Sequence, residues 1–150
     1  MSKKLKILVT TGIYPPSIGG PATYSKLLFD KLPDYGIDTQ FLSFDDVRHL
    51  PKIIRHIVFL LKILRRANGI SIIYAQDPVS VGLPSMLASK ILRKKFWIRI
   101  AGDYAWEQSC QRYGVKDSID DFQNKKYSGR IKLLRKAQTF VAYNAQKIIV

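Results

Sequence analysis

The start of the chain combines a short apolar run, a loop rich in glycine and proline, and a segment with helical spacing. Residues 5–9 are dominated by β-branched and aliphatic side chains, which is typical of a buried strand. Apolar residues then recur at helical spacing over 24–32. In the loop between them, Gly19 and Gly20 let a ligand approach the backbone, and Pro21 suits the first position of a helix. The sequence therefore predicts a strand–loop–helix unit that binds a ligand at the helix N-terminus.

The glycine spacing in this loop matches neither of the two common nucleotide-binding fingerprints. It is not G-x-G-x-x-G, and it is not G-x-x-x-x-G-K-[ST]. The alternative to a binding loop is a plain strand–helix connection built from turn residues. Local chemistry alone leaves both interpretations open.

Strands and helices alternate along the rest of the chain. Four more apolar runs have the length of strands: 37–43, 70–74, 96–100 and 147–150. Helical spacing recurs in three segments: 48–66, 83–92 and 127–146. Residues 108–126 are polar and mixed in charge, and we expect a loop that carries a short helix. Strands joined by crossover helices predict an α/β fold with a Rossmann-like, doubly wound parallel sheet. Because the chain stops inside the last predicted strand, we expect a truncated domain at 1–150.

Polar or glycine-bearing tips follow three of the predicted strands. They are Gly19–Gly20 after the first strand, Gln76–Asp77 after the third, and Gly102–Asp103 with Trp106–Glu107 after the fourth. Ligands of parallel α/β sheets bind beyond the carboxyl ends of the strands, so we expect these tips to converge on one site. The carboxylates there are able to orient hydroxyl groups or to act as a general base. The alternative is that Asp77 and Asp103 cap a helix and a turn.

The segment 48–66 is strongly amphipathic. Its apolar residues form a stripe at helical spacing: Leu50, Ile53, Ile54, Ile57, Leu60, Leu61 and Leu64. Its basic residues are expected on the other side: Arg48, Lys52, Arg55, Lys62, Arg65 and Arg66. We place the two histidines, His49 and His56, on the same solvated face. Such a helix either packs on the core or lies on an anionic membrane surface, and the pattern leaves both open.

Positive charge and a single cysteine limit the partners and the compartment. The chain has 25 Lys+Arg against 11 Asp+Glu, a formal charge of +14, which favours anionic partners. No nucleic-acid recognition motif accompanies that charge, so we do not expect a nucleic-acid partner. Cys110 is the only cysteine, which indicates a reducing compartment. We expect no signal peptide or membrane span, and a cytoplasmic protein with peripheral contact at the inner membrane face.

No metal and no tightly bound cofactor is expected. The histidines, the cysteine and the carboxylates do not cluster at the spacing of metal ligands. Cys110 has no histidine near it in sequence, so nothing indicates a nucleophilic pair.

Three motifs, taken together, resemble one family of enzymes. They are TGIYPPSIGGPATY at 11–24, IYAQDPVSVGLP at 73–84 and IAGDYAWE at 100–107. Their order is similar to that in the N-terminal domain of retaining glycosyltransferases of the glycogen-synthase/sucrose-synthase-like superfamily, which have the GT-B fold. The similarity covers nearly all 150 residues. It implies two Rossmann-like domains that face a cleft, the N-terminal one for the sugar acceptor and the C-terminal one for the nucleotide-sugar donor.

The resemblance also implies roles for individual residues. Many members have a histidine at the tip of the fourth strand, where this chain has Ala101, so the catalytic role is expected to pass to Asp103 or to the Ala101 carbonyl. Substrate contacts are expected at the remaining motif positions: Gly19, Gly20, Tyr24, Gln76, Asp77, Gly102, Trp106 and Glu107.

The resemblance places the residues that hold the donor in the C-terminal domain, outside positions 1–150. We therefore expect this chain to be the acceptor half of a glycosyltransferase, with a nucleotide sugar as co-substrate, and to be inactive without a donor domain. We expect the acceptor to be a polysaccharide, a lipid-linked sugar or a small molecule. The alternative is a non-catalytic module that binds a membrane surface through 48–66.

Overall fold

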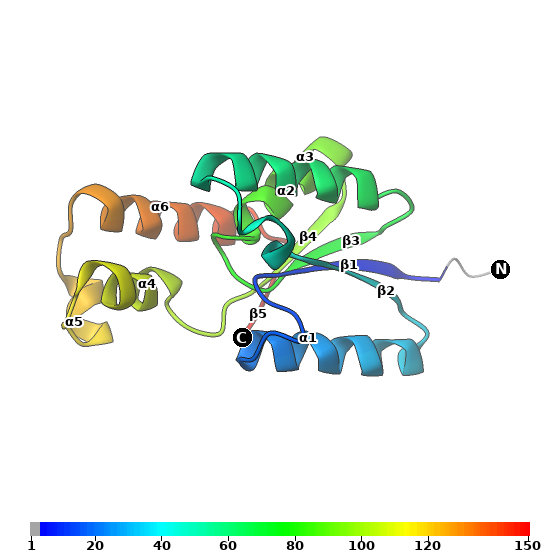
Figure 1. The fold of residues 1–150 in the computed structure, drawn as a ribbon, viewed down its shortest axis with the longest axis horizontal. Coiled ribbons are helices and arrows are strands. Elements are labelled where there is room, and N and C mark those ends of the chain that lie inside the picture. The colour runs from blue at the N-terminus through cyan, green and yellow to red at the C-terminus, as the bar shows by residue number, and fades with distance from the viewer. Residues whose placement is uncertain (1–3) are drawn as a thin grey trace.

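The computed structural model describes residues 4–150, which form an α/β structure (Figure 1). Its strands are β1 (Lys6–Thr11), β2 (Asp38–Ser43), β3 (Ile72–Ala75), β4 (Lys95–Arg99) and β5 (Lys147–Ile149). Its α-helices are α1 (Gly20–Lys31), α2 (Lys52–Arg66), α3 (Gly82–Leu92), α4 (Tyr104–Tyr113), α5 (Ile119–Asn124) and α6 (Gly129–Tyr143). Two 3-10 helices are η1 (Leu32–Tyr35) and η2 (Phe44–Val47).

The sheet confirms the predicted doubly wound, Rossmann-like architecture. Its five strands are all parallel, in the order β2-β1-β3-β4-β5. β1 and β3 lie next to each other at the point where the strand order reverses, which is where such sheets bind ligands. Both strands are almost fully buried, and this explains why each is a nearly continuous apolar run in the sequence.

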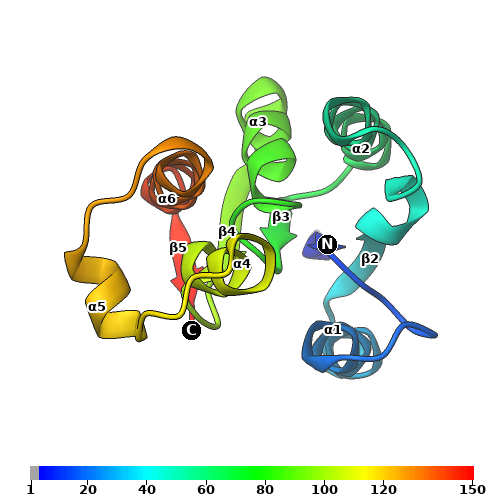
Figure 2. The same ribbon diagram turned by 60° about the vertical axis from the view of Figure 1, so that its left-hand side comes forward.

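Helices cover the two faces of the sheet unequally. Figure 2 shows α1 on one side, and α2, α3 and α6 on the other. The larger core cluster lies on the α2–α3–α6 side and includes Phe59, Ile63 and Met86. A smaller cluster, with Val9 and Tyr74, packs towards α1. No helix within residues 4–150 has the length and apolar character needed to cross a bilayer.

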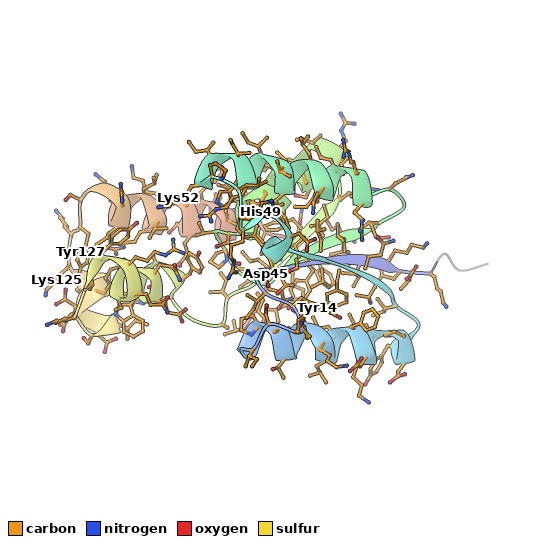
Figure 3. All side chains as sticks on the ribbon, in the orientation of Figure 1. Tyr14, Asp45, His49, Lys52, Lys125 and Tyr127 are labelled. Atoms are coloured by element: carbon orange, nitrogen blue, oxygen red, sulfur yellow. The ribbon has the colours of Figure 1, made fainter. Side chains whose placement is uncertain are left out.

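The helix predicted at 48–66 begins only at Lys52. Pro51 is its N-cap residue and has no N–H, and proline also disfavours a helical conformation at the residue before it. Arg48 therefore follows η2 rather than lying on α2. Figure 3 shows His49 and Lys52 near the start of α2.

The apolar stripe predicted on this helix is also divided differently. Phe59 and Ile63 are fully buried, whereas Ile53 and Ile57 are 77% and 53% exposed. His56 is not on a solvated face, because its ring packs 5.1 Å from the ring of Phe44. The helix thus buries one narrow face and leaves a second apolar face uncovered.

The region expected to be mainly a loop, 108–126, contains most of α4 and all of α5. α4 starts within the predicted strand tip, because the Asp103 carboxylate accepts from the Trp106 N–H at 3.1 Å and caps the helix. Ser118 caps α5 in the same way through the Asp121 N–H.

Pro21 is the second residue of α1 rather than the first. α6 is shorter than the predicted 127–146 at both ends.

Candidate functional site

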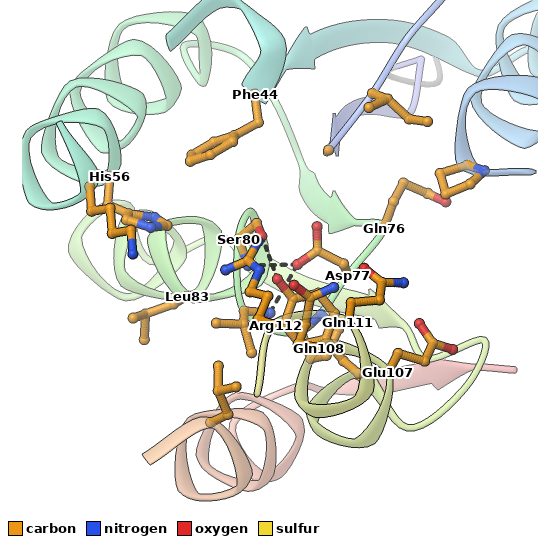
Figure 4. A pocket seen from close by; sticks show the side chains of 18 of the residues that line it. Phe44, His56, Gln76, Asp77, Ser80, Leu83, Glu107, Gln108, Gln111 and Arg112 are labelled. Atoms are coloured by element: carbon orange, nitrogen blue, oxygen red, sulfur yellow. Dashed lines mark hydrogen bonds between the residues drawn. The ribbon is translucent and has the colours of Figure 1, made fainter. Parts of the chain in front are cut away.

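A cleft of about 1120 Å³ lies beyond the carboxyl ends of β1, β3 and β4 (Figure 4). Segments that follow these strands form its floor: Gly12–Ile13, Gln76–Ser80 and Ala101–Gly102. The starts of α2 and α6 and one face of α4 form its walls. The parallel topology thus brings the segments after these three strands to one site, but Gly19 and Gly20, the predicted tip after the first strand, do not line it.

Gln76 lies on the floor of the cleft with its side-chain amide unsatisfied. The residue is only 5% exposed, and neither its Nε2 nor its Oε1 lies within hydrogen-bond distance of a partner among residues 4–150. The amide is near enough to the Tyr74 hydroxyl only to oppose in part the rise in pKa that burial causes there. Buried polar groups are nearly always paired, because leaving one unpaired costs free energy. An unpaired donor and acceptor on one side chain fit a ligand that both accepts and donates.

Asp77, next to Gln76, uses one oxygen to hold its own loop. Its Oδ1 accepts from the N–H groups of Val79 at 3.0 Å, Ser80 at 2.6 Å and Val81 at 3.3 Å, so the carboxylate caps the turn that leads into α3. Burial raises the pKa of Asp77, and the three N–H donors offset only part of that effect. The Oδ2 atom faces Gly12, where an added Cβ would lie 3.4 Å away.

The walls of the cleft are strongly basic. Six cationic side chains line it, against two acidic ones, Asp77 and Glu107, so the cleft carries a net positive charge. The cations are Arg48, Lys52, Arg55, Arg99, Arg112 and Arg130. Arg48 pairs with Asp45 at 3.1 Å, and it also donates to the Gly12 carbonyl. Within residues 4–150, the other five have no carboxylate within 4.0 Å.

The hydroxyl of Tyr104 lies where the basic walls meet the floor. It is 2.7 Å from the Ser80 Oγ. Burial, followed by the negative charge of Asp77, raises the pKa of Tyr104, while Arg112 and Arg55 act in the opposite direction. The guanidinium groups of α2 and α4 are therefore both close enough to act on one hydroxyl. Figure 4 shows Arg112 and Gln108 on the same side of the cleft, facing Ser80.

The imidazole of His56 lies in the same wall of the cleft as Arg55. Burial, followed by the positive charge of Arg55, lowers the pKa of its imidazole below the ordinary value of 6.5. Its Nδ1 is buried and has no partner among residues 4–150, as is also true of the Arg55 Nε and the Gln108 Oε1. Several of the polar atoms left unpaired in the structure thus lie around one cleft.

Apolar side chains line the part of the cleft between α2 and α6. Ile53 and Ile57 come from α2, Leu83 from α3, and Leu133 and Leu134 from α6. Ile53 and Leu133 are 77% and 67% exposed, which is unusual for large apolar side chains. The cleft is therefore polar on its floor and apolar at one rim.

About half of the predicted site residues line the cleft. Those that do are Gln76, Asp77, Ala101, Gly102, Glu107, Arg48, Lys52 and Arg55. Those that do not are Gly19, Gly20, Tyr24, Asp103, Trp106, Lys62, Arg65 and Arg66.

Several of the residues outside the cleft have structural contacts. The Asp103 Oδ1 accepts from the Gln138 Nε2 at 3.2 Å in addition to the N–H of Trp106, and the indole of Trp106 donates to the Asp117 carbonyl at 3.0 Å. The Tyr24 hydroxyl lies 3.4 Å from that of Tyr74. Gly19 is the N-cap of α1.

Apart from Glu107, sequence reasoning missed the polar residues that α4 and α6 contribute. These are Tyr104, Gln108, Gln111, Arg112 and Arg130, together with Arg99 at the end of β4. On α4 they recur at spacings of three and four, which places them on one helix face. That signal becomes visible only once 104–113 is recognised as a helix.

Among residues 4–150, no three or more histidine, cysteine or acidic side chains lie close enough together to hold a metal ion. In comparisons with known proteins, no family model matches this chain, and no curated protein matches it.

Proposed function

We propose that this chain is the acceptor-binding domain of a retaining glycosyltransferase with GT-B architecture. The observation that carries the proposal is the buried, unpaired amide of Gln76 at the floor of a cleft of about 1120 Å³. Neighbouring hydroxyls of a sugar ring each donate and accept, so they satisfy both ends of such an amide. The position of the cleft, at the reversal point of a parallel sheet, also supports a ligand site.

In this proposal, Glu107 takes the place that sequence analysis gave to Asp103. Asp103 does not line the cleft, and its Oδ1 accepts from Trp106 and from Gln138. Glu107 lines the cleft and rests against Gly102, where an added Cβ would lie 2.6 Å from its Oε1. It orients an acceptor hydroxyl, or takes its proton, next to the Ala101 carbonyl.

The donor approaches from the side of α1. Gly19 caps this helix without a side-chain hydrogen bond, and the first turn contains no acidic residue. Pro21 has no N–H, and the Thr23 N–H donates to the Gly19 carbonyl at 3.0 Å. The N–H groups of Gly20 and Ala22 are therefore those left to receive the diphosphate of a nucleotide sugar held by a second domain.

A screen of neutral saccharides tests the acceptor role. The labelled chain is applied to an array of neutral oligosaccharides, and the bound ones are measured by titration calorimetry. We expect Gln76→Met to weaken binding at least tenfold, because each lost hydrogen bond contributes about 0.5–1.5 kcal/mol. Gln123→Met, on exposed α5 and outside the cleft, should bind as the wild type does. Saccharide binding that survives Gln76→Met unchanged would refute the assignment.

A second candidate is a non-catalytic membrane-surface module. The observation that favours it is the uncovered apolar face of α2, where Ile54 and Leu61 are 50% and 48% exposed near Arg65 and Arg66. Apolar side chains next to basic ones match the surface of an anionic bilayer. Co-sedimentation with phosphatidylserine vesicles should be weakened by salt and by Leu61→Ser. Equal binding to neutral phosphatidylcholine vesicles would exclude this reading.

A further inference from the structure

The cleft has two chemically different ends, and the difference identifies a class of acceptor. We propose that the acceptor is an anionic amphiphile, with a phosphate group held between α2 and α4 and a hydrocarbon chain held between α2 and α6. This inference rests on the proposed function and specifies the acceptor within it.

The phosphate position is defined by Arg55 and Arg112. They line different walls of the same cleft, Arg55 on α2 and Arg112 on α4, so a phosphate placed between these walls meets a guanidinium group from each side. Their charges also oppose the rise in the pKa of the Tyr104 hydroxyl. Neither guanidinium has a carboxylate partner among residues 4–150, and the Arg55 Nε has no hydrogen-bond partner there. Guanidinium groups bind phosphate oxygens through paired, charge-assisted hydrogen bonds.

The acidic groups near this position do not neutralise it. The Oδ1 of Asp77 already accepts three backbone hydrogen bonds, so this carboxylate is engaged by its own turn. Glu107 rests against Gly102 on the β4 side of the cleft. Because six cationic side chains and only two acidic ones line the cleft, it attracts a ligand with two or more negative charges, such as a doubly charged phosphate.

The position of the chain is defined by the apolar rim. Figure 4 shows Leu83 on the side of the cleft away from Gln76 and Glu107, so the polar and apolar ends are separate. Ile53, Ile57 and Leu133 extend this rim and are exposed to solvent. A hydrocarbon chain laid along them removes their surface from water, which is favourable in proportion to the area covered. A free sugar phosphate has no apolar group that could cover these side chains.

Three probes separate the two features of the ligand. n-Decyl phosphate has both the anion and the chain, n-decyl β-glucoside has the chain with a neutral head, and glucose 6-phosphate has the anion without the chain. Each is titrated calorimetrically into the 150-residue chain below its micelle concentration. We expect n-decyl phosphate to bind at least tenfold more tightly than either of the others. Tighter or equal binding of glucose 6-phosphate would assign the site to a free phosphorylated sugar and overturn the proposal.

Two pairs of variants locate the contacts. Arg112→Gln should weaken n-decyl phosphate about tenfold or more without affecting n-decyl β-glucoside, whereas Arg65→Gln, outside the cleft, should change neither. Ile57→Ser should weaken both alkyl ligands, whereas Leu61→Ser, one turn further along α2 and similarly exposed, should not. Equal effects of the two members of a pair would mean that the probe binds outside the cleft, and this would refute the proposal.

Failure of this inference is distinguishable from failure of the proposed function. One outcome is that neutral saccharides bind through Gln76, but n-decyl phosphate binds no more tightly than n-decyl β-glucoside. In that case the proposal of an anionic acceptor is refuted, whereas the proposal of an acceptor-binding domain is retained. If no saccharide binds the wild type, the proposed function itself fails.

Discussion

Replacing Gln76 with methionine should stabilise the unliganded chain. Methionine has the same unbranched length and no polar atoms, so the substitution removes a buried donor and acceptor that are both unpaired among residues 4–150. An unsatisfied buried polar group costs about 1–3 kcal/mol, and we expect the free energy of unfolding to rise by a similar amount. For a chain of this length, each kcal/mol corresponds to about 2–4 °C in Tm.

Gln138→Met is the matched control, and we expect it to change the free energy of unfolding in the opposite direction. The Gln138 Oε1 accepts from the Ala105 N–H at 2.9 Å, and its Nε2 donates to Asp103 at 3.2 Å. Methionine there leaves the fully buried Ala105 without its partner, so the free energy of unfolding should fall by about 1–3 kcal/mol. Urea unfolding followed by circular dichroism measures both variants. If Gln76→Met is neutral or destabilising, the amide is satisfied in solution and the central argument for a polar ligand fails.

Three further predictions concern the framework around the cleft. Thr10→Val should lower the free energy of unfolding by about 1–3 kcal/mol, because it leaves the fully buried Ser85 hydroxyl, 2.8 Å from that of Thr10, without a partner. Adding Ser85→Ala should restore most of this stability, as measured by urea unfolding in a double-mutant cycle. Burial raises the pKa of Asp77 above 3.8, so ionisation of this carboxyl group destabilises the fold as the pH rises from 3.8 through the folded pKa. Asp77→Asn should therefore raise the free energy of unfolding, relative to the wild type, more at neutral pH than below pH 3.8. An equal change at both pH values would contradict the raised pKa. Gly82→Ala should cost about 2 kcal/mol or more in the same assay, because the new Cβ would lie 2.4 Å from the Asp77 carbonyl oxygen, whereas Gly20→Ala, with no atom within 4 Å, should be nearly neutral.

The alternation of strands and helices was predictable because each buried strand is an almost continuous apolar run. Pro51 marks the start of α2, so this start was predictable in principle. The apolar periodicity of 48–66 continues on both sides of the proline, however, and this hides the boundary. Which face of α2 is buried was harder to predict. Ile53, Phe59 and Ile63 are all apolar, and only the positions of neighbouring elements decide that the last two face the core.

The site could be predicted in part, for a similar reason. Strand tips such as Gln76 meet wherever parallel strands are neighbours, so topology alone places them together. Arg112 depends on a different piece of information, namely the direction in which α4 crosses the end of the sheet. Asp103 is an N-cap signal that predicts the start of this helix, but its polar surroundings made it resemble a ligand-binding loop.

The two sides of the cleft are fastened to different parts of the molecule. The Asp77 turn is fixed to the sheet and to α3, within the main core. The wall that carries Arg112 is fixed to α6, and Gln138 holds its first turn through both amide atoms. α6 is itself part of the main core through Val141, so α4 is attached to that core by way of α6, and a ligand that bridges both sides of the cleft would add a second, direct link between α4 and the Asp77 turn.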